Sequence, residues 1–129
     1  MTDTMSEELV HPFGWHLLIT LEDCSKEKIG DPANVLFAAF EIARVAGVHV
    51  YSSRNMHSQV EHYGVGELVE GVTAFVPLTT SSLCIHAVDA TRCLYVDMFS
   101  CTSFSPNAVE DQAVREFGGT VRSSRFITV

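Results

Sequence analysis

Hydrophobic and polar residues alternate along the chain in stretches that predict a small set of strands and helices. Residues 16–21 are almost continuously apolar and predict a first strand, and residues 22–30 form a polar connection with room for one helical turn. Residues 32–46 repeat apolar side chains every three or four positions, which predicts a helix with one apolar face. Asp31 is a suitable N-terminal cap for this helix, and Gly47 a suitable left-handed stop.

The rest of the chain predicts further strands and a second helix. Apolar or alternating runs predict strands at residues 48–53, 71–78, 82–88, 93–100 and 120–128. Residues 54–70 are polar and contain glycine, which predicts a long loop that is partly an extended hairpin, and loops of this length are often functional. Ser105 followed by Pro106 predicts the start of the second helix, and Gly118 and Gly119 its end.

The order of these elements predicts an α+β fold. Most links between strands are too short for crossover connections, so we expect a largely antiparallel sheet. Two helices are expected to cover one face of that sheet, giving a two-layer sandwich. The 129 residues suffice for one core, and we expect a flexible lead-in at 1–13 and a single domain at 14–129. A sheet covered on one face only favours a homodimer.

Charge and composition narrow the possible partners. The net charge is −8, with 16 acidic and 8 basic residues, so we expect no nucleic-acid binding and favour a cationic small-molecule substrate. No apolar run is long enough to span a bilayer, and residues 1–8 do not resemble a secretory signal, so we expect a cytoplasmic protein with no membrane association. His57 and His62, with Glu61 between them, match no standard ligand spacing, so no metal site is expected.

A hydroxyl, an imidazole and a thiol recur on two adjacent predicted strands, in Ser81, His86 and Cys101. The motifs that contain or precede them are GWHLL at 14–18, GVT at 71–73, SSLCIH at 81–86 and YVDMFSC at 95–101. In order and spacing these motifs resemble the bacterial and archaeal S-adenosylmethionine decarboxylases. The resemblance extends from residue 14 to about residue 117, and it needs no gap between 81 and 101.

The resemblance implies a self-processing enzyme of polyamine biosynthesis that makes a pyruvoyl cofactor from Ser81. The Ser81 hydroxyl would attack the carbonyl of Thr80, turn the peptide bond into an ester, and leave a cleaved chain after elimination. His86 would shuttle the proton, Thr73 would stabilise the oxyanionic intermediate, and Cys101 would reprotonate the substrate carbon. The pyruvoyl carbonyl would form a Schiff base with the substrate amine and accept electrons as carbon dioxide leaves.

The chain departs from the family pattern at several positions. Thr80 stands where the family has glutamate, and AVDA at 87–90 replaces Thr-Trp-Pro-Glu, so Asp89 is the nearest acid to the family's ribose-binding glutamate. The phenylalanine that stacks on adenine is missing, and Tyr63 is the candidate replacement. Three functions therefore stay open: decarboxylation of S-adenosylmethionine, decarboxylation of arginine or ornithine, or a binding or regulatory role in a homologue that does not process. A basic amino acid could pair with an acid among Glu61, Glu67, Glu70 and Asp89.

Overall fold

The structure is a computed structural model in which residues 13–129 are described. The lead-in expected at residues 1–13 falls outside this range except for Phe13. Six strands are present, β1 (Trp15–Cys24), β2 (Gln59–Tyr63), β3 (Gly71–Leu78), β4 (Ser81–Val88), β5 (Cys93–Ser100) and β6 (Gly118–Thr128). The helices are α2 (Lys26–Ile29), α3 (Pro32–Ala46) and α4 (Pro106–Phe117).

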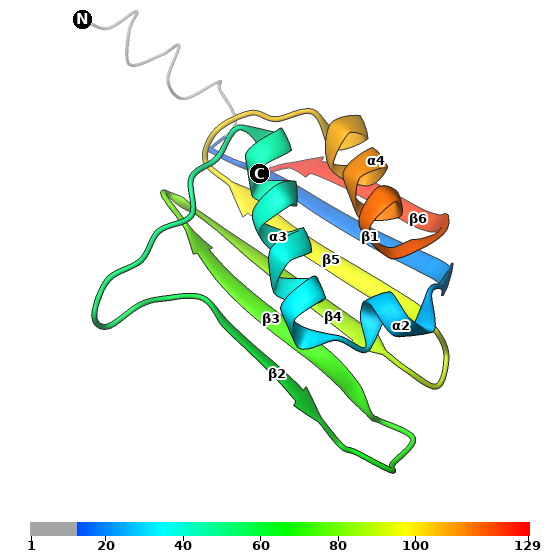
Figure 1. The fold of residues 1–129 in the computed structure, drawn as a ribbon. Helices are drawn as coiled ribbons and strands as arrows, with labels where there is room; N and C mark the ends of the chain where they lie inside the picture. Colours follow the sequence, from blue (N-terminus) through cyan, green and yellow to red (C-terminus); the bar gives the residue numbers. More distant parts are fainter. Residues whose placement is uncertain (1–12) are drawn as a thin grey trace, which may run out of the picture.

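The strands form one antiparallel sheet in the order β2-β3-β4-β5-β1-β6. All three helices lie on the same face of this sheet, and no helix of residues 13–129 lies on the opposite face (Figure 1). The α+β two-layer sandwich predicted from the sequence is therefore confirmed. The third helix, α2, is a single turn within the polar connection that follows β1.

The two longer helices begin and end where their sequences supply caps. The Asp31 side chain accepts a hydrogen bond from the Ala33 backbone N–H at 3.1 Å, and Ser105 does the same for Ala108 at 3.2 Å. Helix α3 ends at Gly47, whose φ of 78° lies in the left-handed region that glycine adopts at little cost. These contacts satisfy backbone groups that a helix terminus leaves unpaired.

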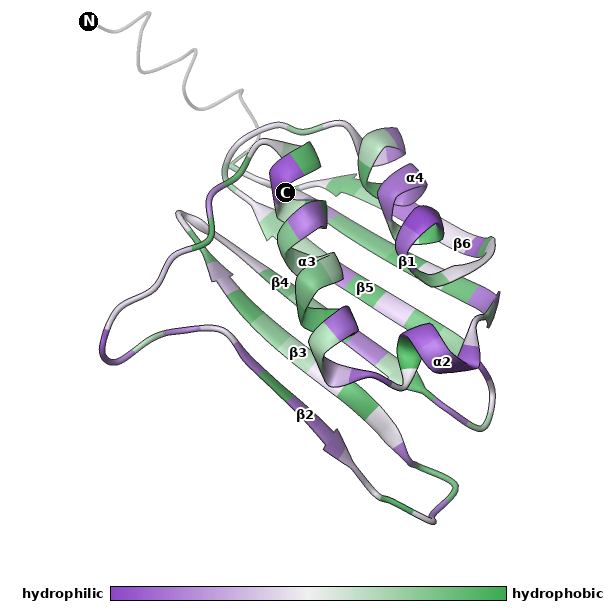
Figure 2. Cartoon of the chain, in the orientation of Figure 1, coloured by the Kyte–Doolittle hydropathy of each residue, from purple (hydrophilic) through white to green (hydrophobic). Residues whose placement is uncertain are grey.

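Alternation along the strands separates a covered face from an open face. Leu83, Ile85 and Ala87 of β4 face the helices and are buried, and they join a core built from the four central strands, α3 and α4. Hydrophobic residues are concentrated in those strands and in α3, whereas α2 and α4 carry more polar residues (Figure 2). On the open face, Phe75 is 58% exposed and Tyr95 is 44% exposed.

The prediction of a strand at residues 48–53 is wrong. Only Val50 pairs there, in an isolated bridge with Leu78. The long β3 edge is instead occupied by β2, which lies inside the stretch predicted to be a loop with a hairpin. Because β2 fills that edge, residues 48–53 have only the end of β3 to bond with, as in the 2.9 Å hydrogen bond from the Tyr51 N–H to the Pro77 carbonyl.

None of the helices within residues 13–129 is both long and apolar enough to cross a membrane.

Candidate active site

A hydrogen-bonded cluster on the open face joins three of the residues singled out in the sequence. The hydroxyl of Thr73 lies 2.8 Å from His86 Nδ1, and the hydroxyl of Tyr63 lies 3.0 Å from the same nitrogen. The Thr73 hydroxyl also donates to the Tyr63 oxygen at 3.2 Å. The register explains the cluster, because Thr73 lies directly opposite His86 on β4 and Tyr63 comes from the neighbouring edge strand β2.

The imidazole of His86 is further fixed by aromatic neighbours. Its ring is stacked between Tyr63 and Tyr95, with centroids 6.1 and 6.2 Å away and interplanar angles of 20° and 29°. Both hydroxyl contacts are closest at Nδ1, while Nε2 has only a 3.4 Å contact with the Tyr63 hydroxyl. The cluster therefore holds the ring in one orientation and leaves Nε2 as the less engaged nitrogen.

A second cluster lies at the turn between β3 and β4, around the peptide bond that joins Thr80 to Ser81. The backbone N–H of Cys101 donates a 3.3 Å hydrogen bond to the Thr80 carbonyl oxygen. Thr80 has a φ of 60°, a left-handed conformation that is strained for a β-branched residue. The Ser81 hydroxyl is shielded from solvent and has no hydrogen-bond partner among residues 13–129.

The structure does not bring Ser81 and His86 together within one chain. They are five residues apart on β4, which corresponds to roughly 17 Å along an extended strand. Five is also an odd number, so the two side chains point to opposite faces. Ser81 shares the covered face with Leu83, whereas His86 lies on the open face with Cys84.

A groove of about 500 Å³ lies beside Ser81. Its lining includes Phe75, Cys84 and Asp97. Burial raises the pKa of the Cys84 thiol, and the nearby Asp97 carboxylate raises it further. The groove therefore combines apolar walls with one carboxylate and keeps its thiol protonated, which suits a cationic ligand.

The sequence analysis missed a contact between a histidine and a carboxylate at this groove. His16 Nε2 lies 2.6 Å from a carboxylate oxygen of Asp97, on adjacent strands β1 and β5. A polar signal was available, because both residues interrupt otherwise apolar strands at positions that face away from the core.

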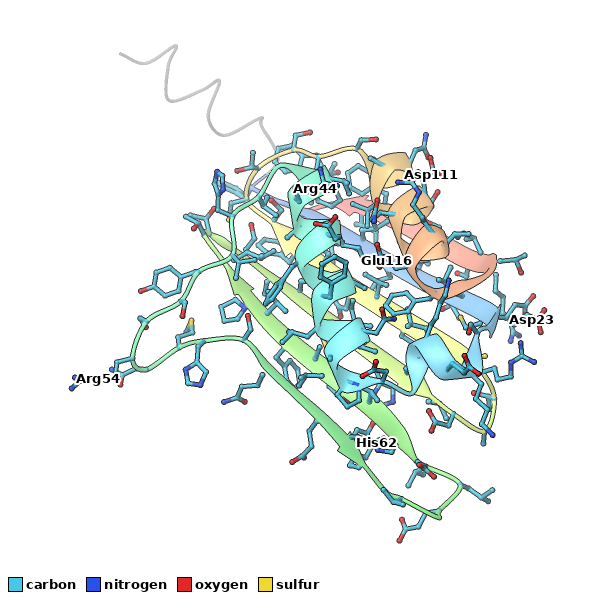
Figure 3. The ribbon with its side chains drawn as sticks, in the orientation of Figure 1. Asp23, Arg44, Arg54, His62, Asp111 and Glu116 are labelled. Atoms are coloured by element: carbon cyan, nitrogen blue, oxygen red, sulfur yellow. The ribbon has the colours of Figure 1, made fainter. Side chains whose placement is uncertain are left out.

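Asp89 lies in a different place from the Thr73–His86 cluster. It follows the end of β4 and lies near Glu70 and His62. Figure 3 labels His62 on the edge strand β2. Tyr63 and His62 are consecutive on β2 and so point to opposite faces of the sheet. Of the two residues proposed for substrate binding, Tyr63 therefore joins His86 and Asp89 does not.

Comparisons with known proteins agree with this architecture. The fold and the serine-bearing turn define an α+β protein with a residue in the left-handed conformation directly before a central strand. The S-adenosylmethionine decarboxylase family profile matches residues 15–127, and the chain therefore belongs to that family. The fold is similar to the crystal structure of the adenosylmethionine decarboxylase from Aquifex aeolicus VF5, with a TM-score of 0.73 and 16% identity over 92% of each chain. No curated protein sequence matches the chain significantly.

Proposed function

We propose that this chain is a cytoplasmic, pyruvoyl-dependent S-adenosylmethionine decarboxylase of polyamine biosynthesis that cleaves itself between Thr80 and Ser81. The observation that carries the proposal is the geometry of that peptide bond. Its carbonyl accepts a hydrogen bond from the Cys101 N–H, its first residue is held at a φ of 60°, and its serine hydroxyl has no hydrogen-bond partner in the described part of the chain.

Each of these features favours attack by the Ser81 hydroxyl on the Thr80 carbonyl carbon. Negative charge develops on the carbonyl oxygen during attack, and a backbone N–H already directed at that oxygen stabilises it. The C–N bond then breaks and an ester forms, with the amino group released on Ser81. Elimination breaks the ester and yields the Thr80 carboxylate and a dehydroalanine, which water converts into a terminal keto group with loss of ammonia.

The general base for this step is proposed to come from a second copy of the chain. A base must lie within about 3 Å of the proton that it accepts, and the His86 of the same chain is much too distant. Ser81 lines a groove that also contains the open-face residues Cys84 and Asp97, so a two-fold dimer through the open faces would present the partner's His86 to Ser81 once the serine side chain turns toward that groove. The exposed side chains of Phe75 and Tyr95 support this dimer, because such a contact would bury both.

Cys101 and Asp97 are proposed to act in substrate turnover, together with the carbonyl group derived from Ser81. The serine-derived carbonyl withdraws electrons from the substrate as carbon dioxide leaves. Cys101 is exposed directly after β5, where its thiol can return a proton to the substrate carbon. Asp97 in the groove beside Ser81 supplies a carboxylate for a cationic group, whether the sulfonium of S-adenosylmethionine or the side chain of a basic amino acid.

One observation favours the alternative of a homologue that does not process: within residues 13–129, no basic side chain forms a hydrogen bond with the Ser81 hydroxyl. Intact-mass spectrometry after hydroxylamine treatment separates the two functions. The proposal expects two fragments divided between Thr80 and Ser81, a hydroxylamine adduct on the downstream fragment, and one intact species for Ser81→Ala. A single species near 14.2 kDa after prolonged incubation of the wild-type protein would establish the alternative.

A further inference from the structure

A cluster of three potential ligands lies on the covered face, away from the proposed active site. His62 comes from the edge strand β2, Glu70 precedes β3, and Asp89 follows β4. One ligand atom from each residue lies within 4.8 Å of the other two. Three segments that are distant in sequence therefore converge on one point.

The contacts within this cluster are poor as hydrogen bonds. His62 Nε2 is 3.0 Å from a Glu70 oxygen and 3.8 Å from an Asp89 oxygen, yet it makes no hydrogen bond of acceptable geometry. The other carboxylate oxygen of Asp89 also has no partner, and both of these atoms are shielded from solvent. Buried polar atoms without a partner cost free energy, and a cation bound between these residues would interact favourably with both atoms.

The two carboxylates are not neutralised by the basic residues beside them. Lys26 and Arg92 line the adjoining groove, but within residues 13–129 neither forms an ion pair with Glu70 or Asp89. The Arg92 guanidinium is directed instead to the Cys24 carbonyl at 2.8 Å. Within residues 13–129, His62 is thus the one basic side chain paired with either carboxylate.

The carboxylates are also held in place. Glu70 accepts a 3.1 Å hydrogen bond from the Gly66 N–H on one oxygen and directs the other at His62. The Asp89 N–H donates a 3.0 Å hydrogen bond to the Glu70 carbonyl, which ties the two acidic residues together. Outer contacts of this kind orient the ligands of a metal ion.

We propose that His62, Glu70 and Asp89 bind a divalent first-row transition metal ion such as Zn²⁺. Bonds of about 2.0–2.2 Å to one ion separate neighbouring ligand atoms by roughly 3–3.6 Å, close to the two separations at His62 Nε2. A mixed nitrogen and oxygen set favours these ions over Mg²⁺, which prefers oxygen ligands. The sequence suggested no metal site because its ligands come from three separate segments.

The ion would join the edge strand β2 to the β4–β5 turn. Among the described strands, β2 pairs with β3 alone, so it has less support than the inner strands. His62 is adjacent to Tyr63, whose hydroxyl contacts His86. Metal binding at this site therefore rigidifies the strand that supplies Tyr63, and it does so whether or not the chain processes itself.

Isothermal titration of the metal-stripped full chain with Zn²⁺ tests the proposal. We expect one high-affinity site per chain, and a loss of affinity of at least about tenfold in Asp89→Asn and in His62→Gln. Asp97→Asn is the matched control, because it makes the same chemical change in the other histidine–carboxylate pair, and it should bind as the wild type does. Unchanged unfolding temperatures in EDTA would show that the variants fold.

Two further measurements test whether the metal ion binds at a site other than His62, Glu70 and Asp89. The Co²⁺ complex should lack the charge-transfer absorption that thiolate ligands produce, which excludes the four cysteines. Amide exchange in residues 59–63 should slow when Zn²⁺ is added to the wild type but not to Asp89→Asn. The proposal is overturned if the wild type binds no Zn²⁺, if Asp89→Asn and His62→Gln bind it unchanged, or if the Co²⁺ spectrum shows thiolate ligation.

Discussion

Processing between subunits can be tested by mixing two inactive chains. Ser81→Ala removes the nucleophile, and His86→Ala removes the proposed base. The two positions are five residues apart on β4, or roughly 17 Å, whereas proton transfer needs contact within about 3 Å. A base on the same chain is thus too distant, and we expect each variant alone to remain uncleaved or to cleave very slowly.

Coexpression of the two variants should restore cleavage to a defined extent. Random pairing at equal amounts makes half of the dimers mixed, and a two-fold mixed dimer has one site with both intact residues and one site with neither. Only the His86→Ala chain can be cut, and only in mixed dimers. About a quarter of all chains should therefore be cleaved, all of them carrying the His86→Ala substitution.

The assay is intact-mass spectrometry, which distinguishes the two chains by mass. Phe75→Glu in both chains serves as a control, because a charge on the exposed open face should prevent the dimer and abolish the rescue. If the coexpressed chains stay intact while the wild type cleaves, the base does not come from the partner. Cleavage of the Ser81→Ala chain would contradict the assignment of the nucleophile.

Three further changes probe other parts of the structure. Tyr63→Phe removes one hydrogen bond to His86 and should slow processing about two- to tenfold in a timed gel assay, without moving the unfolding temperature much. Thr80→Gly should relieve left-handed strain, so it should stabilise the uncut chain by up to about 1 kcal/mol in urea unfolding and slow its cleavage. Asp23→Gly, a control that is also at positive φ, should leave cleavage unchanged. Burial, with a smaller effect of neighbouring charges, raises the pKa of the Cys24 thiol from 9.0 to about 11. The free energy of unfolding should therefore be constant below pH 9 and fall by about 2–3 kcal/mol as the pH rises to 11, a loss that Cys24→Ala should remove.

The sequence predicted most of the fold because its signals were local. Helix α3 carries its own cap, its own stop and a continuous apolar face, so it could be predicted to the residue. The antiparallel order of β3, β4 and β5 followed from short links that permit nothing else. Strand β2 could not be predicted in the same way, because its five residues are mostly polar and its pairing depends on a free β3 edge. Residues 48–53 have the composition of a strand, but they form no strand because only Val50 has a pairing partner, Leu78.

The candidate site was predicted as a set of residues but not as an arrangement. The register of β4 and β5 explains why Cys101 reaches the Thr80 carbonyl, and these strands were predicted to be adjacent in a largely antiparallel sheet. The odd spacing between Ser81 and His86 already implied opposite faces, although that consequence emerges only once the strand is known to be regular. The contact of the Tyr63 hydroxyl with His86 could not be predicted, because it depends on the position of β2.

Threonine at position 80, where the family has glutamate, has two consequences for the cleaved bond. Glutamate would supply a carboxylate beside the cleaved bond, and Thr80 removes it. Threonine also places a β-branched side chain at a φ of 60°, which adds about 1 kcal/mol or more of strain to the uncut chain. Cleavage relieves this strain, because Thr80 then becomes the free end of the upstream fragment. Self-processing should therefore tolerate this replacement better than substrate recognition does, and differences in chemistry from the rest of the family should appear first in the choice of substrate.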